Sequence, residues 1–163
     1  LESLHTADCQ VIHLSPQGTP FCQTEAERLT EARHLIFLCG HYEGIDQRVL
    51  DAWVDREISI GDYILTNGAL AAAVVIDATV RLLPGVLGGG AEAAQAESCS
   101  SGLLDHPHYT RPENFRGEKV PEVLLSGNHA AIEAWRHEKA MEKTRRVRPD
   151  LLQSQHEDEQ LPD

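Results

Sequence analysis

The sequence predicts an α/β fold with a mostly parallel sheet, and three observations support this prediction. Residues 34–39 (HLIFLC) form a continuous apolar run of strand length, which is typical of a strand buried on both faces. Strand-like and helix-like segments alternate through the first half of the chain. Two glycine-containing loops, residues 39–46 (CGHYEGID) and 60–68 (IGDYILTNG), each follow a strand-like run and precede a helix-like segment. Because glycine has no Cβ, these loops let a flat polar ligand approach the backbone closely, and we expect a cofactor there.

The elements expected in the first half are short. Strands are expected at residues 9–14, 34–39 and 57–60, and helices at residues 23–33, 45–54 and 68–83. Residues 15–18 (SPQG) have the composition of a turn that closes the first strand. The last of these helices is expected to pack through one stripe, which consists of Leu70, Val74, Ala78 and Leu82.

The second half of the chain is less regular. Residues 88–102 are small, polar and low in complexity, so we expect a mobile loop. Residues 103–112 (LLDHPHYTRP) are rich in hydrogen-bonding groups. Asn128 is expected to cap a helix that runs to Lys143. Two apolar residues of that helix are expected to face inward, Ile132 and Trp135.

Composition limits the class of protein. A chain of 163 residues suits one domain, or one domain with a short appendage. The net charge of −12 argues against non-specific nucleic-acid binding by the chain as a whole, although basic residues gather near the C-terminus. The 4 cysteines show no CxxC spacing and indicate reduced thiols in a cytoplasmic protein. No apolar run is long enough to span a bilayer, so no membrane attachment is expected.

Six sequence blocks occur in order along the chain. They are LSPQG at residues 14–18, CGHYEGID at residues 39–46, ISIGDYILTNG at residues 58–68, RLLPGVLG at residues 81–88, GLLDHPHYTRP at residues 102–112 and LLSGNH at residues 124–129. In these blocks the chain resembles the bacterial tRNA (guanine-N1)-methyltransferases, the TrmD family of the SPOUT superfamily. The resemblance covers most of residues 10–152.

The resemblance implies a fold, an activity and partners. In a SPOUT-type fold the C-terminal part of the sheet is threaded into a deep trefoil knot, a feature that composition and periodicity do not indicate. The implied reaction transfers a methyl group from S-adenosylmethionine to N1 of guanine at position 37 of tRNA. The implied enzyme is a cytoplasmic homodimer in which two subunits form each active site, with no further protein partner. The resemblance also raises magnesium (Mg) as a second cofactor.

The same resemblance divides the chain into three parts. Residues 1–112 correspond to the SPOUT cofactor-binding domain, residues 113–126 to a connector, and residues 127–163 to a shortened helical tRNA-binding domain with an acidic tail that we expect to be disordered. The family carries a further N-terminal segment that these residues do not include, so we expect either a fragment of a complete enzyme or a reduced relative. Because its loss would expose a sheet edge, we expect this chain to be less stable than an N-terminally extended form.

The resemblance also assigns the cofactor site. The residues at cofactor-binding positions, including those that complete the second loop, are Gly40, Glu43, Ile60, Gly61, Asp62, Tyr63, Ile64, Leu65 and Gly68. The expected contacts are mostly backbone hydrogen bonds to adenine between apolar walls. The alternative is that these glycines only make turns.

Methylation of guanine N1 places three demands on the protein. The N1 proton must leave, the negative charge that grows toward O6 must be stabilised, and the methyl group must lie in line with N1. By resemblance, Arg81 is the catalytic arginine that meets O6. The alternative is an ion pair with Asp77 on a helix surface, worth only about 0.3–0.5 kcal/mol. This chemistry requires no metal.

Two carboxylates complete the implied catalytic set. Glu97 stands where the family has an aspartate before a serine, so it is the candidate general base, and the alternative is a solvated loop carboxylate. Asp105 aligns with the aspartate that contacts the target guanine, and the alternative is a turn residue ahead of His106. The spacing of His106, His108 and the residues near Cys39 fits no common zinc pattern, so no metal site is predicted.

A basic set is the candidate RNA-binding surface. Arg111 is expected to grip phosphate or to pack its loop. The other candidates for anticodon-stem phosphates are Lys139, Lys143, Arg145, Arg146 and Arg148. A merely solvated helix face is the alternative. Two other functions stay open for the whole chain: a cofactor-binding or dimerisation fragment without catalysis, and a SPOUT methyltransferase with a different RNA target.

Overall fold

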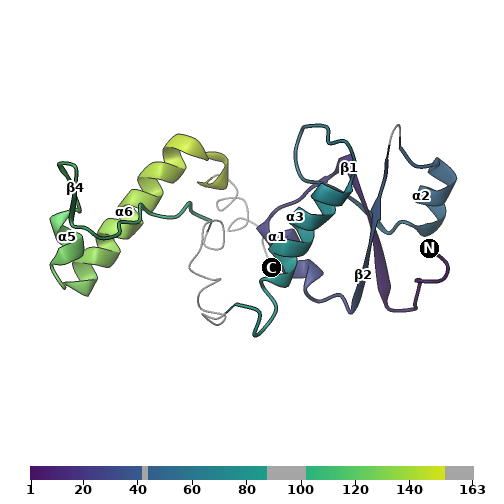
Figure 1. The fold of residues 1–163 in the computed structure, drawn as a ribbon, viewed down its shortest axis with the longest axis horizontal. Coiled ribbons are helices and arrows are strands. Elements are labelled where there is room, and N and C mark those ends of the chain that lie inside the picture. The colour runs from purple at the N-terminus through teal and green to yellow at the C-terminus, as the bar shows by residue number, and fades with distance from the viewer. Residues whose placement is uncertain (42–43, 88–101, 153–163) are drawn as a thin grey trace, which may run out of the picture. The chain divides into compact units, whose positions relative to one another are not determined.

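The computed structural model describes residues 1–41, 44–87 and 102–152 of the chain. These residues belong to two compact units, Leu1–Ala91 and Glu92–Asp163, and each unit is described by itself (Figure 1). Contacts alone therefore divide the chain after Ala91, within the segment that precedes the GLLD block. The three-part division at residues 112 and 126 stays a prediction.

The first unit is built on a three-stranded parallel sheet. Its strands are β1 (Cys9–Pro20), β2 (His34–Cys39) and β3 (Arg56–Ser59), in the order β2-β1-β3. The central strand pairs Val11 with Ile36 of β2 and His13 with Glu57 of β3. The apolar run of β2 predicts burial on both faces. In the described sheet β2 is an edge strand in which Ile36 is buried and the other residues are half-buried. The predicted α/β class with a mostly parallel sheet is confirmed, and the knot stays a prediction.

The predicted turn at residues 15–18 is wrong, because β1 continues to Pro20. Its register against β3 shifts between Leu14 and Thr19, so the SPQG segment bulges and then rejoins the same strand. Gly18 makes the return possible, since a Cβ at that position would lie 2.5 Å from the Ile58 nitrogen. The close approach of the β1 and β3 backbones thus produces a bulge where the local sequence predicts a turn.

The core of this unit lies between the sheet and two helices. It consists of Ile12, Leu14, Leu29, Ile58, Ala71, Ala72 and Val75. The helices are α1 (Gln23–Leu29) and α3 (Ala69–Val80), and Figure 1 shows both on one side of the strands, with α2 (Gln47–Trp53) on the other. Asp46 caps α2 by accepting a hydrogen bond from the Arg48 N–H at 2.9 Å.

The helix α1 ends four residues before its predicted end at residue 33. The Thr30 hydroxyl donates to the Glu27 carbonyl oxygen at 2.6 Å, and the chain turns back to begin β2 at His34. Side-chain competition for helical carbonyl groups is a known reason for threonine at helix ends. The prediction of this boundary was wrong because helix-compatible composition continues past the cap.

The predicted packing stripe of α3 is also wrong. The buried residues are Ala71, Ala72, Val75 and Thr79. Two members of the predicted stripe are exposed, Leu70 by 63% and Val74 by 49%. Because α3 carries apolar residues around most of its circumference, periodicity does not identify the face toward the sheet. Small residues allow close packing there, which leaves the larger apolar side chains outside.

The second unit is mainly helical. It contains a hairpin of β4 (Asn114–Phe115) and β5 (Glu118–Lys119), the short helix α5 (Glu122–Leu125) and the long helix α6 (His129–Val147). The segment expected to be a connector therefore holds a hairpin and a helix. Asn128 caps α6 as predicted, because its side-chain oxygen accepts from the Ala131 N–H at 3.2 Å. Ile132 and Trp135 are half-buried.

Within the described residues, no helix has the length and apolar content needed to cross a membrane.

Candidate active site

A hollow of about 590 Å³ lies at the carboxyl ends of β2 and β3 in the first unit. Ligands commonly bind at this edge of a parallel sheet. The residues around the hollow are His13, Leu14, Ser15, Pro16, Gln17, Gly40, His41, Gly44, Ile45, Gln47, Leu50, Glu57, Ile58, Ser59, Ile60, Gly61, Tyr63, Ile64, Leu65, Thr66, Asn67, Gly68 and Ala71. Both glycine-containing loops of the sequence thus meet at one site.

Backbone contacts fasten the two loops to each other. The Gly68 N–H donates to the Gly40 carbonyl oxygen at 3.1 Å, and His41 and Asn67 form an antiparallel β-bridge. A Cβ on Gly68 would lie 3.1 Å from the Cys39 Cα, which is tighter than ordinary contact. Glycine at this position therefore lets the loops touch and sets the width of the hollow.

The second loop is held in shape by its own side chains. The Ser59 hydroxyl accepts from the Gly61 N–H and donates to the Gly61 carbonyl oxygen, both at 3.2 Å. The Tyr63 hydroxyl donates to the Ile60 carbonyl oxygen at 3.1 Å. Gly61 has φ +148°, and a Cβ there would lie 2.4 Å from the Tyr63 ring. The backbone groups of this loop are thus fixed before a ligand arrives.

Seven of the predicted cofactor-binding residues line this hollow. They are Gly40, Ile60, Gly61, Tyr63, Ile64, Leu65 and Gly68. Asp62 is exposed and does not belong to the lining. Glu43 lies outside the described residues.

The sequence reasoning missed one wall of the hollow. Residues 13–17 line it, although LSPQG had been read as a turn and as a family block only. His13 is buried, and its Nδ1 lies 3.0 Å from Oε1 of Glu57 on the neighbouring strand. The available signal was the order of blocks, because each of the three motifs follows a predicted strand and the carboxyl ends of parallel strands meet at one sheet edge.

The predicted catalytic residues lie in different parts of the chain. Arg81 follows α3 directly, is half-buried, and its backbone N–H donates to the Asp77 carbonyl oxygen at 3.2 Å. Asp105 belongs to the second compact unit. Glu97 and most of the predicted mobile loop lie outside the described residues. Arg81 and Asp105 thus belong to different units, and each is described within its own unit.

Asp105 lies in a polar environment within the second unit. Its Oδ2 accepts from His108 Nε2 at 2.7 Å, and its Oδ1 accepts from the backbone N–H of His106 at 2.7 Å. Partial burial acts to raise the pKa of Asp105, but the hydrogen bonds from His108 and His106 outweigh it and hold this pKa below its ordinary value. The carboxylate is therefore ionised near neutral pH and suited to accept hydrogen bonds.

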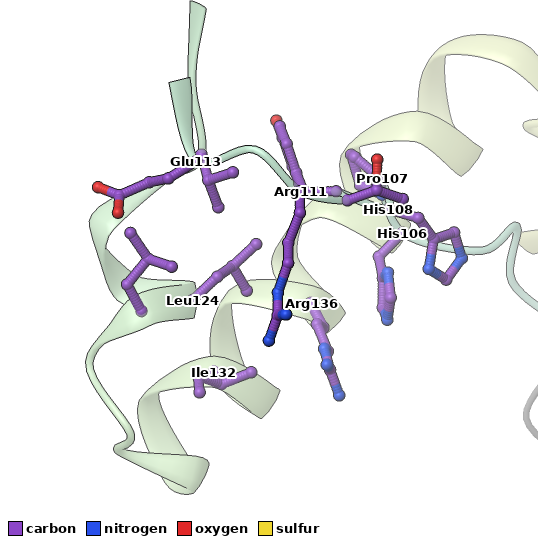
Figure 2. A pocket seen from close by; sticks show the side chains of 12 residues that line it. His106, Pro107, His108, Arg111, Glu113, Leu124, Ile132 and Arg136 are labelled. Atoms are coloured by element: carbon purple, nitrogen blue, oxygen red, sulfur yellow. The ribbon is translucent and has the colours of Figure 1, made fainter. Parts of the chain in front are cut away.

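A second hollow of about 530 Å³ lies beside this segment, between residues 106–113, α5 and α6. Arg111 lines it together with Arg136 of α6, a cation that the sequence reasoning did not single out. Figure 2 shows both arginine side chains extending in the same direction, with the rings of His106 and His108 next to each other. Arg136 also pairs with Glu133 at 2.8 Å. The guanidinium groups of the two arginines can bind an anionic ligand.

The basic residues predicted to bind tRNA lie on or just after α6. Several already have partners: Lys139 Nζ lies 2.7 Å from Glu142 Oε2, and Arg148 Nη2 lies 2.6 Å from Asp150 Oδ2. The hydrogen bond to Glu142 raises the pKa of Lys139. Three further members of the set, Lys143, Arg145 and Arg146, are exposed. Exposed ion pairs of this kind contribute little to stability.

Comparison with known proteins supports the resemblance of the sequence blocks. The family model for "tRNA (Guanine-1)-methyltransferase TrmD" matches residues 1–154. Proteins named tRNA (guanine-N(1)-)-methyltransferase are 59% identical over 152 residues in Protochlamydia amoebophila, 59% over 145 residues in Anoxybacillus flavithermus and 54% over 151 residues in Chlamydia caviae.

These matches cover 93%, 89% and 93% of this chain. They cover 68%, 59% and 42% of the three relatives, so the chain spans from about two fifths to about two thirds of their length. With nearly the whole chain matched by the family model, the protein belongs to the TrmD family of tRNA (guanine-1)-methyltransferases.

Proposed function

We propose that the protein transfers a methyl group from S-adenosylmethionine to N1 of guanine at position 37 of tRNA. The observation that carries this proposal is the hollow at the sheet edge, because seven residues expected at cofactor positions line it in a chain that the TrmD model matches over residues 1–154. The relatives' names give the reaction class, and the hollow supplies a place for its cofactor.

The residues around the hollow fit the proposed cofactor. A volume of about 590 Å³ suits a ligand of nucleoside size. Fixed backbone groups of the 60–68 loop suit the edge of an adenine ring, and apolar side chains suit its faces. Ile64 is 81% exposed and Tyr63 54% exposed, which leaves apolar surface for a ligand to cover. When bound, the cofactor supplies the methyl group.

The roles proposed for the chain's own groups follow from the reaction. The guanidinium of Arg81 stabilises the charge that develops on guanine O6. Glu97 accepts the N1 proton. The Asp105 carboxylate, whose pKa is lowered, accepts a hydrogen bond from the exocyclic amine of guanine, a group that adenine lacks at that position. These three groups are assembled when the tRNA and both subunits are in place.

The proposed RNA contacts are electrostatic. Arg111 and the cations on and after α6 bind phosphates of the anticodon stem, and Arg136 joins them because it lines the same hollow as Arg111. A chain with net charge −12 repels RNA elsewhere, so the contacts concentrate on this unit. The proposal includes a cytoplasmic location, where tRNA is found.

The proposed assembly is a homodimer. Four apolar side chains on α3 are 41–63% exposed in the single chain: Leu70, Val74, Ile76 and Val80. Exposed apolar residues gathered on one helix are typical of a surface that another protein covers.

Among the described residues, the cluster of three groups that could hold a metal ion does not fit magnesium. Their metal-compatible cluster holds one carboxylate and two imidazoles, Asp105, His106 and His108. Mg²⁺ prefers oxygen ligands in octahedral geometry, so this donor set does not fit it. No step of the proposed reaction uses magnesium.

The experiment that tests the function is labelled-methyl transfer to an unmodified tRNA transcript with guanine at position 37. We expect transfer to this transcript and none to its adenine-37 counterpart. Glu97→Gln should lower the rate by about 10²–10⁴-fold, the usual contribution of a general base. Glu92→Gln is the matched control, because it removes a carboxylate from the same stretch of sequence.

Transfer that survives Glu97→Gln would retain the enzyme and discard Glu97 as base. Transfer to RNA that does not depend on guanine 37 would favour a SPOUT methyltransferase with another target. A folded chain that binds S-adenosylmethionine by calorimetry yet transfers nothing would favour the non-catalytic reading.

A further inference from the structure

The segment between Leu104 and Tyr109 brings together three groups that can ligate a metal ion. They are Asp105, His106 and His108, and one ligand atom from each lies within 4.8 Å of the others. The Nδ1 atom of His106 is buried and, among the described residues, has no hydrogen-bond partner. A buried imidazole nitrogen without a partner leaves a lone pair or an N–H unsatisfied, which is unfavourable unless a ligand binds there.

The two histidines approach the same carboxylate. His108 Nε2 lies 2.7 Å from Asp105 Oδ2, and His106 Nδ1 lies 3.7 Å from Asp105 Oδ1. The centroids of the two rings are 4.6 Å apart, and Figure 2 shows the rings next to each other. Ligand atoms around a tetrahedral zinc ion are about 3.3 Å apart, given bonds of about 2.0–2.1 Å. Closure around an ion therefore requires the most distant ligand atoms to approach each other by up to about 1.5 Å.

The backbone that carries these groups is fastened to α6. The Leu104 N–H donates to the buried Thr144 hydroxyl at 2.9 Å, and Lys143 Nζ lies 3.5 Å from the Asp105 carbonyl oxygen. At the other end, the Tyr109 ring lies 6.3 Å from the Trp135 ring. Pro107 restricts the backbone between the two histidines. These contacts order the backbone of the segment in the folded protein, so metal binding loses less conformational entropy.

We propose that Asp105, His106 and His108 form a binding site for a transition-metal ion of the Zn²⁺ type. Two imidazoles and one carboxylate are ligands that Zn²⁺, Co²⁺ and Ni²⁺ accept and that Mg²⁺ does not favour. A fourth position stays open to water. The sequence spacing predicts no metal site. The three ligands nevertheless lie close together because they belong to one folded segment, residues 105–108.

One consequence rests on the proposed function. Asp105 is the group assigned there to the guanine amine, so an ion that occupies its carboxylate competes with the tRNA. Zn²⁺ then inhibits methyl transfer, and a chelator restores it. The binding itself does not depend on this, so the site can hold even where the proposed function fails.

The test is a titration of the full chain with Co²⁺ under reducing conditions, followed by visible absorption, and with Zn²⁺, followed by calorimetry. We expect one saturable site whose affinity falls at least about tenfold in His106→Ala and in His108→Ala. The controls are His129→Ala and His137→Ala, two exposed histidines of α6, and both should leave the affinity unchanged. The His108 side chain is 68% exposed, so its variant folds even if the His106 variant does not.

Several outcomes overturn the proposal. One is an affinity that is unchanged in His108→Ala. Another is a near-ultraviolet charge-transfer band from Co²⁺, which would assign the ion to cysteine thiolates. A third is paramagnetic broadening by Co²⁺ of the His129 or His137 ring signals, with those of His106 and His108 unaffected. Broadening confined to His106 and His108 supports it.

Discussion

At the scale of single residues, Glu25 of α1 ties a helix to the edge of the sheet. Its side chain is 13% exposed; Oε1 accepts from Arg28 at 2.5 Å, and Oε2 accepts from Arg56 of β3. The hydrogen bond from Arg56 is the main cause that lowers the pKa of Glu25 from its ordinary value of 4.5, and burial opposes it. A carboxyl group whose pKa is lowered by folding adds stability above its unfolded pKa, and that stability is lost as the pH falls through the folded value.

We expect Glu25→Gln to lower the free energy of unfolding by about 1–2 kcal/mol at pH 7, because it replaces a charge-assisted hydrogen bond by a neutral one. The loss should shrink below pH 4.5, where the wild-type carboxylate is also being protonated. Urea denaturation at several pH values measures both effects. Glu27→Gln, an exposed change on the same helix, should stay within about 0.5 kcal/mol. A loss that is the same at all pH values would contradict the assignment to charge.

At the scale of elements, Thr144 joins α6 to the segment that carries Asp105. Its hydroxyl is fully buried, donates to the Ala140 carbonyl oxygen at 2.7 Å and accepts from the Leu104 N–H at 2.9 Å. A residue of the same shape without the hydroxyl leaves the partly buried Leu104 N–H without its hydrogen-bond partner. Thr144→Val should therefore destabilise the unit by about 1–3 kcal/mol, measured by urea denaturation.

The same change should also loosen the Asp105 segment, seen as faster hydrogen exchange at the Leu104 amide. Thr144→Ser keeps the hydroxyl and is the matched control, with most of the protection retained. Equal exchange rates in the valine and serine variants would show that the segment is held by other contacts.

At the scale of the whole molecule, the proposed homodimer is expected to form through the exposed apolar residues of α3, which include Leu70 and Val74. Replacing Leu70 and Val74 by glutamate should convert the proposed homodimer to a monomer, because charge on an apolar interface must be desolvated without a partner. Light scattering after gel filtration measures the mass directly. Leu4→Glu is the control, since Leu4 is 57% exposed and lies outside α3. A wild-type chain that is monomeric at all concentrations would remove the homodimer from the proposal.

Local pattern predicted some features well. The apolar run of β2 was predicted with its observed bounds, and the Asn128 cap was predicted because a single side chain satisfies a nearby N–H group. The two glycine-containing loops were placed correctly at strand ends, and seven of the residues predicted to bind the cofactor line one hollow. Motifs of this kind depend on neighbours within a few residues, so the sequence carries them directly.

Other features depend on contacts between distant segments. The bulge that replaced the turn at residues 15–18 exists because Gly18 lies against Ile58. The buried face of α3 is set by close packing on the sheet. Because most positions of this helix are apolar, its sequence does not identify that face. Arg136 joins Arg111 only because α6 passes beside the 106–113 segment.

The sequence by itself determined the α/β class, the order of the elements in the first unit and the family, because strand runs, caps and ordered motif blocks consist of consecutive residues. Only the tertiary structure decided that His13 forms a wall of the hollow and that Asp105 meets both histidines, because those distances depend on how the chain folds back on itself. Chemistry at a site follows from distances of a few ångströms, and these are set by packing rather than by order along the chain.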